Sequence, residues 1–319
     1  MCYKVWSMEQ HRDAPAVVIA ALAFLSGISV GQSTPPGSPL SKSPSVTISF
    51  FVEDGHGNAS AKSVAPADLS VLDKEKHQQT ILSIRTAKDL PLRIGVLIDS
   101  SGSAGHSDLY GPAVQAAFDF LKQEMSGPDD KGFLVQFTDI AAATEFFTKD
   151  EISKLQVSLV TRGGTALYDA VNGACRERMK PDPVQPARRV LLILSDGEDN
   201  SSRITRNQAI AVAQAMNTVL FALNTGTFIE NSKGRKVLEQ MTDQTGGRLF
   251  DSMRTKDLPK IFASLGNLLD NMQSVTFVPS EPAQPREFRP IELKIATDSK
   301  LKIHAAKAYY GTDSTPPAP

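Results

Sequence analysis

The chain has 319 residues, of which 41% are hydrophobic and 22% charged, and its formal net charge at pH 7 is −1. This length leaves room for one large domain or two modest ones, with a core that can hold the fold without disulfide bonds. The near balance of charge gives no reason to expect nucleic acid or an anionic membrane surface as the partner.

An apolar run of ten residues, 16–25, lies near the N-terminus and is followed by small residues. It is shorter than the roughly 20 apolar residues that span a bilayer, and its layout is typical of a secretory signal. We therefore predict a signal peptide at residues 1–31. The mature chain is then expected to be exported, periplasmic or secreted, with no transmembrane span. A buried helix is the alternative interpretation of this run.

The chain contains two cysteines, Cys2 and Cys175, and Cys2 would leave with the signal peptide. The mature chain would then carry one thiol and no internal disulfide bond, so its stability would depend on its core. Cys175 lies in an apolar helical pattern, and we interpret it as a core residue and not as a nucleophile.

The segment after the signal peptide divides into a linker and a β-rich part. Residues 32–44 are rich in Pro, Ser and Gly, which predicts a flexible linker. In residues 45–92, hydrophobic side chains alternate with smaller or polar ones at 46–52, the pattern of a half-buried strand. Further short strands are expected at 69–72 and 80–84.

Residues 93–272 alternate between predicted strands and predicted helices. Nearly continuous apolar runs, typical of parallel strands covered on both faces, occur at 94–98, 133–137, 190–194 and 219–223. Amphipathic stretches of helical length occur at 112–125, 166–178, 206–216, 233–242 and 256–271. This alternation predicts a doubly wound α/β domain, in which helices cover both faces of a mostly parallel sheet. The basic pair Arg188 and Arg189, before the third run, is expected to be solvated.

Residues 273–311 return to a β-rich pattern, and residues 312–319 form a tail. The stretches "REFRPIELKIA" and "LKIHAAKAYYG" each predict one strand. Two β-rich segments around one α/β domain favour pairing between them in a small β module. The sequence does not establish that pairing.

Oxygen-bearing side chains follow two of the predicted strands and one glycine-rich loop. Five residues share this position: Asp99, Ser101, Ser103, Thr165 and Asp196. In an open α/β sheet, the carboxyl ends of parallel strands face the crevice in which ligands bind. Two carboxylates and three hydroxyls form a set of hard oxygen ligands that suits Mg²⁺ or Mn²⁺. We therefore predict a divalent-metal site at which an incoming carboxylate can complete the coordination.

Each of these residues has a simpler interpretation when it is taken alone. Ser101 and Ser103 would be cap or turn residues, Thr165 would be a helix N-cap, and Asp196 would be a turn residue. The metal interpretation depends on their joint occurrence in this order.

Further residues are candidates for the rim of the site: His106, Asp108, Asp139, Glu198 and Asp199. The alternatives are a surface loop for His106, a turn for Asp139, and a solvated loop for Glu198 and Asp199.

Three motifs carry a resemblance to a known family. "DSSGS" at residues 99–103, "GGT" at 163–165 and "SDGEDN" at 195–200 occur in this order. Over about residues 93–272, the chain therefore resembles the von Willebrand factor type A domain. The flanks, including "GGTALYDAV" and "KAYYG", resemble the von Willebrand factor A-related proteins that bacteria export. The sequence departs from the family pattern at Ala104, where a Met is frequent, and we expect this to affect loop packing.

The resemblance implies an intact metal-ion-dependent adhesion site. Ser101, Ser103 and Thr165 would be direct or near-direct ligands, and Asp99 and Asp196 would act partly through water. The ion would be Mg²⁺, with Mn²⁺ or Ca²⁺ as alternatives. The implied partner is a protein whose acidic residue completes the coordination.

Two classes of function therefore follow from the sequence. The first is an exported adhesion or interaction module that binds a protein through the metal ion. The second is a metal-assisted hydrolase that uses the ion as a Lewis acid. A hydrolase needs a positioned general base, and the stretch "DSSGSAG" does not fit the G-x-S-x-G elbow of a serine hydrolase. The sequence also has no G-x-x-x-x-G-K-[ST] loop for phosphate. We expect a binding protein with no catalytic residues.

Overall fold

The computed structural model describes residues 4–6, 45–61, 63–86, 89–182, 185–226, 232–252, 254–281, 283–284, 287–295 and 300–310. The apolar run of the predicted signal peptide, the predicted linker and the predicted tail lie outside these ranges. Among the described residues, no helix combines the length and the hydropathy that a membrane span needs.

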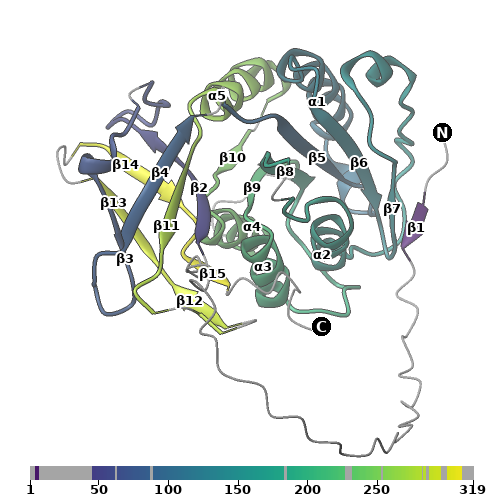
Figure 1. The fold of residues 1–319 in the computed structure, drawn as a ribbon. Helices are drawn as coiled ribbons and strands as arrows, with labels where there is room; N and C mark the ends of the chain where they lie inside the picture. Colours follow the sequence, from purple (N-terminus) through teal and green to yellow (C-terminus); the bar gives the residue numbers. More distant parts are fainter. Residues whose placement is uncertain are drawn as a thin grey trace, which may run out of the picture.

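A seven-stranded sheet forms the centre of the α/β part, in the order β1-β7-β6-β5-β8-β9-β10 (Figure 1). Its strands are β1 Lys4–Trp6, β5 Leu92–Asp99, β6 Lys131–Phe137, β7 Ala141–Ala143, β8 Arg188–Ser195, β9 Thr218–Asn224 and β10 Leu249–Asp251. The pairs from β6 to β10 are parallel, and β7 and β1 add an antiparallel edge. β1 lies within the predicted signal peptide, so a chain cleaved after Gly31 would lose this edge strand.

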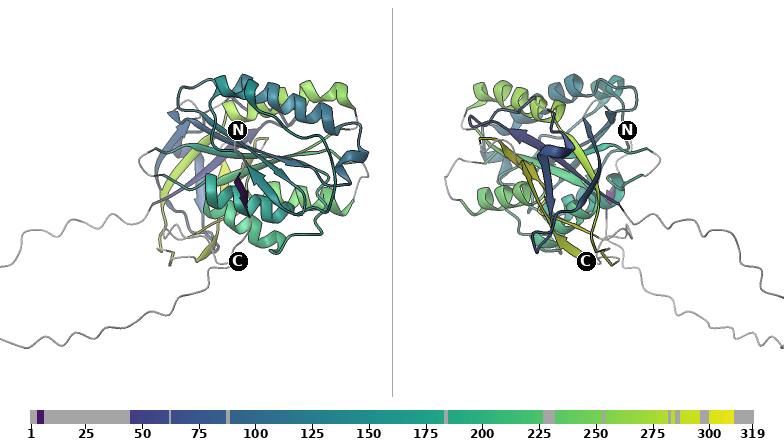
Figure 2. Two further views of the ribbon diagram at one scale, coloured as in Figure 1. Left: turned by 90° about the vertical axis from the view of Figure 1, so that its right-hand side faces the viewer. Right: turned by 60° about the vertical axis from the view of Figure 1, so that its left-hand side comes forward.

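Helices cover both faces of this sheet (Figures 1 and 2). They are α1 Tyr110–Glu124, α2 Leu167–Arg178, α3 Arg206–Ala215, α4 Lys233–Gln244 and α5 Leu258–Asp270. Each lies within two residues of a helix expected from the sequence. Short 3-10 turns occur at Pro66–Asp68, Ala104–His106, Lys149–Lys154 and Thr255–Asp257.

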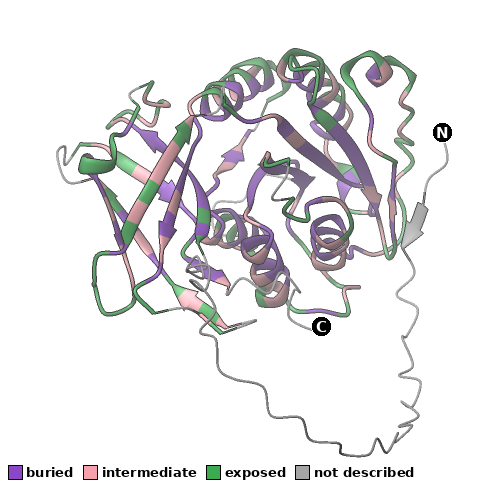
Figure 3. Ribbon diagram, in the orientation of Figure 1, coloured by how far each residue is buried: buried purple, intermediate pink, exposed green. Residues whose placement is uncertain are grey.

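Two hydrophobic clusters, one on each face of the sheet, explain the continuous apolar runs. α1 and α5 pack against alternate residues of β5 and β8, such as Val96 and Leu192. α2, α3 and α4 pack against the intervening residues, such as Leu97 and Ile193. Because successive side chains of a strand point to opposite faces, both faces of these strands must be apolar, and Figure 3 shows them buried. The predicted doubly wound, mostly parallel sheet is confirmed.

A β module lies beside the α/β domain and is built from both flanks of the chain. Its main sheet has the order β14-β2-β11-β4, and two further strand pairs are β13-β3 and β12-β15. The strands are β2 Val46–Glu53, β3 Leu69–Leu72, β4 Thr80–Thr86, β11 Gln273–Val278, β12 Phe288–Pro290, β13 Glu292–Ile295, β14 Lys302–Ala305 and β15 Ala308–Tyr310. The C-terminal β11 lies between the N-terminal β2 and β4. The pairing of the two flanks that the sequence favoured is therefore present.

The C-terminal flank differs from its prediction in one respect. "REFRPIELKIA" and "LKIHAAKAYYG" each form two short strands where one was expected. The halves pair with different partners, because β12 pairs with β15, whereas β13 pairs with β3 and β14 with β2. Pro290 ends β12 and has no backbone N–H to continue a ladder.

Strand β2 joins the module to the α/β domain. Ile48, Phe50 and Val52 belong to the core of the module, whereas Phe51 points into the cluster below α1 and α5. Phe51 stacks on the His304 ring, with 4.7 Å between centroids.

A buried ion cluster stands at the same junction, around Glu53, which is 5% exposed. Glu53 lies 2.7 Å from Arg248 Nη1 and 2.8 Å from His304 Nε2. Arg248 directly precedes β10 of the α/β domain, whereas Glu53 and His304 belong to the β module, so the cluster links the two parts of the molecule.

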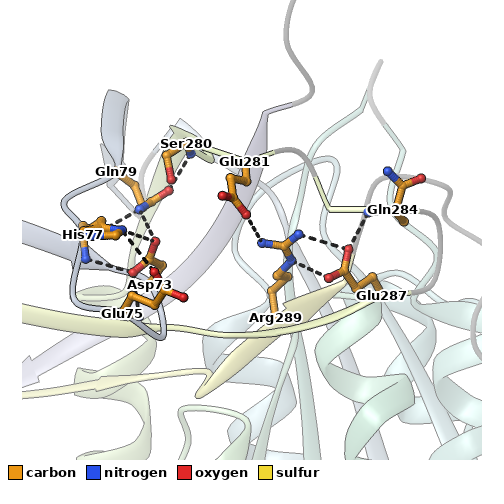
Figure 4. Close-up of polar contacts among 9 residues, drawn as sticks. All are labelled: Asp73, Glu75, His77, Gln79, Ser280, Glu281, Gln284, Glu287 and Arg289. Atoms are coloured by element: carbon orange, nitrogen blue, oxygen red, sulfur yellow. Dashed lines mark hydrogen bonds and ion pairs between the residues drawn. The ribbon is translucent and has the colours of Figure 1, made fainter.

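A polar network closes the turn between β3 and β4 (Figure 4). Asp73 Oδ1 accepts hydrogen bonds from the backbone N of Glu75 (2.9 Å) and of His77 (2.8 Å). Gln79 Nε2 donates to Asp73 Oδ2 at 3.3 Å, and Gln79 Oε1 accepts from Ser280 N at 2.7 Å. Gln79 therefore ties this turn to the segment that follows β11.

Candidate metal site

Asp99 ends β5 with its side chain completely buried. Its Oδ1 accepts a hydrogen bond from Ser101 N (2.9 Å), and its Oδ2 accepts one from Ser195 Oγ (2.6 Å) at the end of β8. In the part of the chain that the structure describes, no cationic side chain forms an ion pair with it. Burial raises the pKa of Asp99 against the effect of these hydrogen bonds, and the charge of Asp196 raises it further. A cation would stabilise the ionised form of this carboxylate.

Two hydroxyls follow Asp99 in the same loop. Ser101 is buried and Ser103 is exposed, and their Oγ atoms lie 3.2 Å apart. Gly102 N donates to Gly163 O at 3.1 Å, which brings the second glycine-containing loop against this one. Ala104, the departure from the family pattern, is fully buried in the cluster below α1 and α5.

The "GGT" loop needs both of its glycines. Gly163 has φ +76°, in the left-handed region that favours glycine. A Cβ on Gly164 would lie 2.2 Å from Ser201 Oγ and 2.5 Å from Asp139 Oδ1. Asp139 Oδ1 accepts hydrogen bonds from Gly164 N (2.9 Å) and Ser201 Oγ (3.0 Å). Asp139, a rim candidate, therefore braces this loop.

Thr165 joins the second loop to the third. It is 2% exposed, its N donates to Asn200 Oδ1 at 2.8 Å, and its O accepts from the N of Asn200 and of Ser201, both at 3.0 Å. Asp196, which follows β8, is partly buried, and its Oδ1 accepts from Glu198 N at 3.0 Å. Direct hydrogen bonds therefore connect all three loops that carry the five candidate ligands.

The remaining rim candidates fall into two groups. His106, Asp108 and Glu198 are exposed to solvent. Asp199 Oδ2 accepts from Tyr168 N at 2.9 Å, in the first turn of α2, so this carboxylate caps the helix.

The chemistry of the five side chains fits a divalent cation. They supply two carboxylates and three hydroxyls, and the buried carboxylate of Asp99 lacks a counter-charge. Nowhere in the described ranges do three or more His, Cys, Asp or Glu side chains gather as a metal-binding group. Hydroxyl oxygens and water would therefore have to provide much of the coordination. Hard cations such as Mg²⁺ accept these oxygen ligands.

A groove of about 400 Å³ lies beside these loops, at the edge formed by β6 and β7. Ile140 and Val160 line it and are 58% and 67% exposed, and the neighbouring Leu159 is 56% exposed. Among the described residues, five large hydrophobic side chains are at least half exposed, and three of the five are Ile140, Leu159 and Val160. The groove is therefore bordered by a concentrated apolar surface, with Arg162 beside it.

Hydrogen bonds connect the wall of this groove to the candidate ligands. Gln136 Nε2 donates to Ser100 Oγ at 2.8 Å, and Arg162 N donates to Ser100 O at 2.9 Å. Ser100 stands between Asp99 and Ser101 in the chain, so the groove and the candidate site share one loop.

Sequence reasoning missed two supporting side chains. Ser195 orients Asp99, and Asn200 holds Thr165, yet neither was assigned a role. Both are polar residues at the ends of the "SDGEDN" motif, and their place in the same motif as Asp196 is the sequence signal that could have identified them.

Comparison with known proteins gives a distant likeness. No family model and no curated protein matches the chain. A von Willebrand factor type A structure from Catenulispora acidiphila has 13% identity, covering 86% of this chain and 76% of that one, with a TM-score of 0.46. The manganese-loaded TRAP protein of Plasmodium vivax has 12% identity, 70% and 96% coverage, and a TM-score of 0.42.

Proximal thread matrix protein 1 from the mussel byssus has 20% identity and a TM-score of 0.43, with 58% of this chain covered. The match spans 47% of the mussel protein, about half of its length. At these identities and scores, the fold assignment rests on the strand order and the helix layers described above.

Proposed function

We propose that this protein is an exported interaction module of the von Willebrand factor A type, which binds an acidic residue of a partner protein through a divalent cation. The observation that supports this most strongly is Asp99, a buried carboxylate without a counter-charge at the meeting point of three hydrogen-bonded loops. Asp99, Ser101, Ser103, Thr165 and Asp196 would hold the ion, with Mg²⁺ first and Mn²⁺ or Ca²⁺ as alternatives. When bound, the ion supplies an electrophilic position for a carboxylate oxygen.

The charge balance of the five side chains favours a carboxylate as the incoming group. Asp99 and Asp196 together carry two negative charges, which match a divalent ion, and the three hydroxyls add none. Neutral hydroxyls donate weakly, so an anionic oxygen from a partner is a strong additional ligand.

The neighbouring surface favours a protein partner. Ile140, Leu159 and Val160 present apolar side chains beside the loops, and Arg162 adds a positive charge. Apolar contacts around a central charged anchor are the arrangement that protein interfaces use. Binding is preferred to hydrolysis because His106, the histidine nearest the serines in the chain, is exposed. Its hydrogen bond to them in the described structure runs from its backbone N to Ser103 O and does not involve the imidazole.

Titration calorimetry of Mg²⁺ and Mn²⁺ into the metal-free protein tests the site. We expect saturable binding that is lost in Asp99→Ala and in Asp196→Ala. Asp119→Ala is the control, because it removes an exposed carboxylate of α1 that lies outside the loops carrying the candidate ligands. An unchanged affinity in Asp99→Ala would show that the ion binds elsewhere.

The partner is tested separately, by capture from cell envelopes in Mg²⁺ or in EDTA. We expect a captured protein to be released by EDTA, and Val160→Asp to weaken its capture while Mg²⁺ affinity stays unchanged. If Val160→Asp captured as much partner as the wild type, the apolar surface would not take part in partner binding.

A further inference from the structure

A second cavity, of about 620 Å³, lies between the β module and the α/β domain. It reaches the start of β8 at Arg189, whereas the candidate metal site lies at the end of the same strand. Six residues of strand, about 20 Å, separate the two ends. The other lining residues include some from the end of α3 and from β2, β4, β11 and β15. Figure 1 shows where these elements lie.

Arg189 is a buried cation at the wall of this cavity. It is 7% exposed, and its Nε donates to Met216 O at 2.7 Å. Within the described ranges, no carboxylate forms an ion pair with its guanidinium. Burial lowers the pKa of Arg189 to about 10, and the nearby charge of Arg93 acts in the same direction. The expectation that the pair Arg188 and Arg189 is solvated is wrong for Arg189.

A buried charge without a partner destabilises a protein unless a ligand compensates it. The acidic side chain that lines the cavity, Asp182, accepts a hydrogen bond from Gln185 N at 3.1 Å. Arg85, which is exposed, adds a second positive charge to the lining. The basic side chains of the lining therefore outnumber the acidic one, although the whole chain is nearly neutral.

The rest of the lining includes apolar surface. Val46, Ile48 and Pro186 contribute aliphatic side chains, and Tyr309 and Tyr310 of β15 also line the cavity while their rings pack against Phe277 and Phe288. Tyr309 is 7% exposed, so it adds little accessible surface to the lining.

We propose that this cavity binds a small organic anion, with an oxyanion group on Arg189 and an apolar or aromatic body against the aliphatic side chains of the lining. The volume lies within the roughly 300–1,000 Å³ of small-molecule sites, and convergent donors on mostly apolar walls are typical of such sites. This site is independent of the metal site, since no candidate metal ligand lines it.

The test compares four probes of similar shape by titration calorimetry on the intact protein. Benzoate and phenyl phosphate carry the two kinds of oxyanion, benzyl alcohol is neutral, and benzylamine is cationic. We expect saturable binding of at least one anion, and the preferred anion distinguishes a carboxylate site from a phosphate site. Equal binding of benzyl alcohol, or no binding of either anion, would overturn the proposal.

Arg189→Gln removes the charge and keeps a hydrogen-bond donor. We expect it to weaken anion binding about tenfold or more, which corresponds to at least about 1.4 kcal/mol. Arg254→Gln is the control, because this exposed arginine lines neither cavity, and it should leave binding unchanged. Arg189→Lys, which keeps the charge, should bind more tightly than Arg189→Gln and serves as a second variant if the first fails to fold. Equal affinities in the wild type and Arg189→Gln would contradict the assignment.

Discussion

Ser195 Oγ donates a 2.6 Å hydrogen bond to Asp99 Oδ2, and this bond joins the carboxyl ends of the neighbouring strands β8 and β5. The strands are in register up to Ile98 and Leu194, so Asp99 and Ser195 are the next residues on each. Ser195 Oγ also accepts from Gly197 N at 3.0 Å. One hydroxyl therefore orients Asp99 and starts the turn that carries Asp196.

Removal of this hydroxyl should weaken the proposed metal site without abolishing it. We expect Ser195→Ala to lower Mg²⁺ affinity about tenfold, since partners that orient metal ligands have effects of about 10–100-fold. The lost hydrogen bond should also lower the free energy of unfolding by about 1 kcal/mol. Calorimetry and urea denaturation measure the two effects. Ser107→Ala is the control, and an unchanged Mg²⁺ affinity in Ser195→Ala would contradict the orienting role.

Asp99→Asn should change stability in opposite directions with and without metal. Without metal, the substitution removes a buried charge that repels Asp196, so the melting temperature should stay equal or rise. With saturating Mg²⁺, the wild type should gain stability by mass action and the variant should not. Melting temperatures of the wild type and the variant, measured in EDTA and in Mg²⁺, separate the effect of the buried charge from the effect of metal binding. A variant that is less stable than the wild type in EDTA would show that Asp99 is structural.

Glu124 should make stability depend on pH. It ends α1 beside α5, where a Cβ on Gly266 would lie 2.5 Å from Glu124 Oε1. Burial and the charge of Asp270 raise the pKa of Glu124 to about 7, against the opposing effect of Arg188. Because the folded-state pKa exceeds the usual value of 4.5, the folded protein binds this proton more tightly than the unfolded chain.

The contribution of Glu124 is therefore complete below about pH 4.5 and is lost as the pH rises through 7. Relative to Glu124→Gln, the wild type should lose about 1–2 kcal/mol across this range, a figure reduced for partial exposure to solvent. Urea denaturation at intervals from pH 4.5 to 8.5 measures the difference. Asp119→Asn, an exposed acid on the same helix, is the control. Parallel pH profiles for the wild type and Glu124→Gln would refute the prediction.

Cys175 should be unreactive in the folded protein. Its side chain is fully buried in α2, and burial raises the pKa of its thiol to about 12. The thiolate that attacks disulfide reagents is then scarce as well as shielded. We expect a Cys2→Ser protein to react with an aromatic disulfide at pH 8 only after denaturant is added. Fast reaction without denaturant would place the thiol outside the core.

The sequence by itself determined the layers of the α/β domain. Apolar runs covered on both faces and amphipathic stretches are local patterns, because a strand or helix records its surroundings in its own periodicity. The candidate ligands were found for a similar reason, since Asp99 and Asp196 come directly after such runs.

Only the tertiary structure decided which side chains meet across loops. Asp139 and Asp199 follow predicted strands as the candidate ligands do, yet their carboxylates accept backbone N–H groups of the "GGT" loop and of α2. Arg189 lies at the start of a strand, where a solvated residue is expected, but it is buried and its Nε donates to Met216 O after α3. Such outcomes depend on contacts between segments far apart in the chain, as when β11 enters between β2 and β4. Local periodicity carries no record of those partners, because it reports how far a residue is buried and not what lies against it.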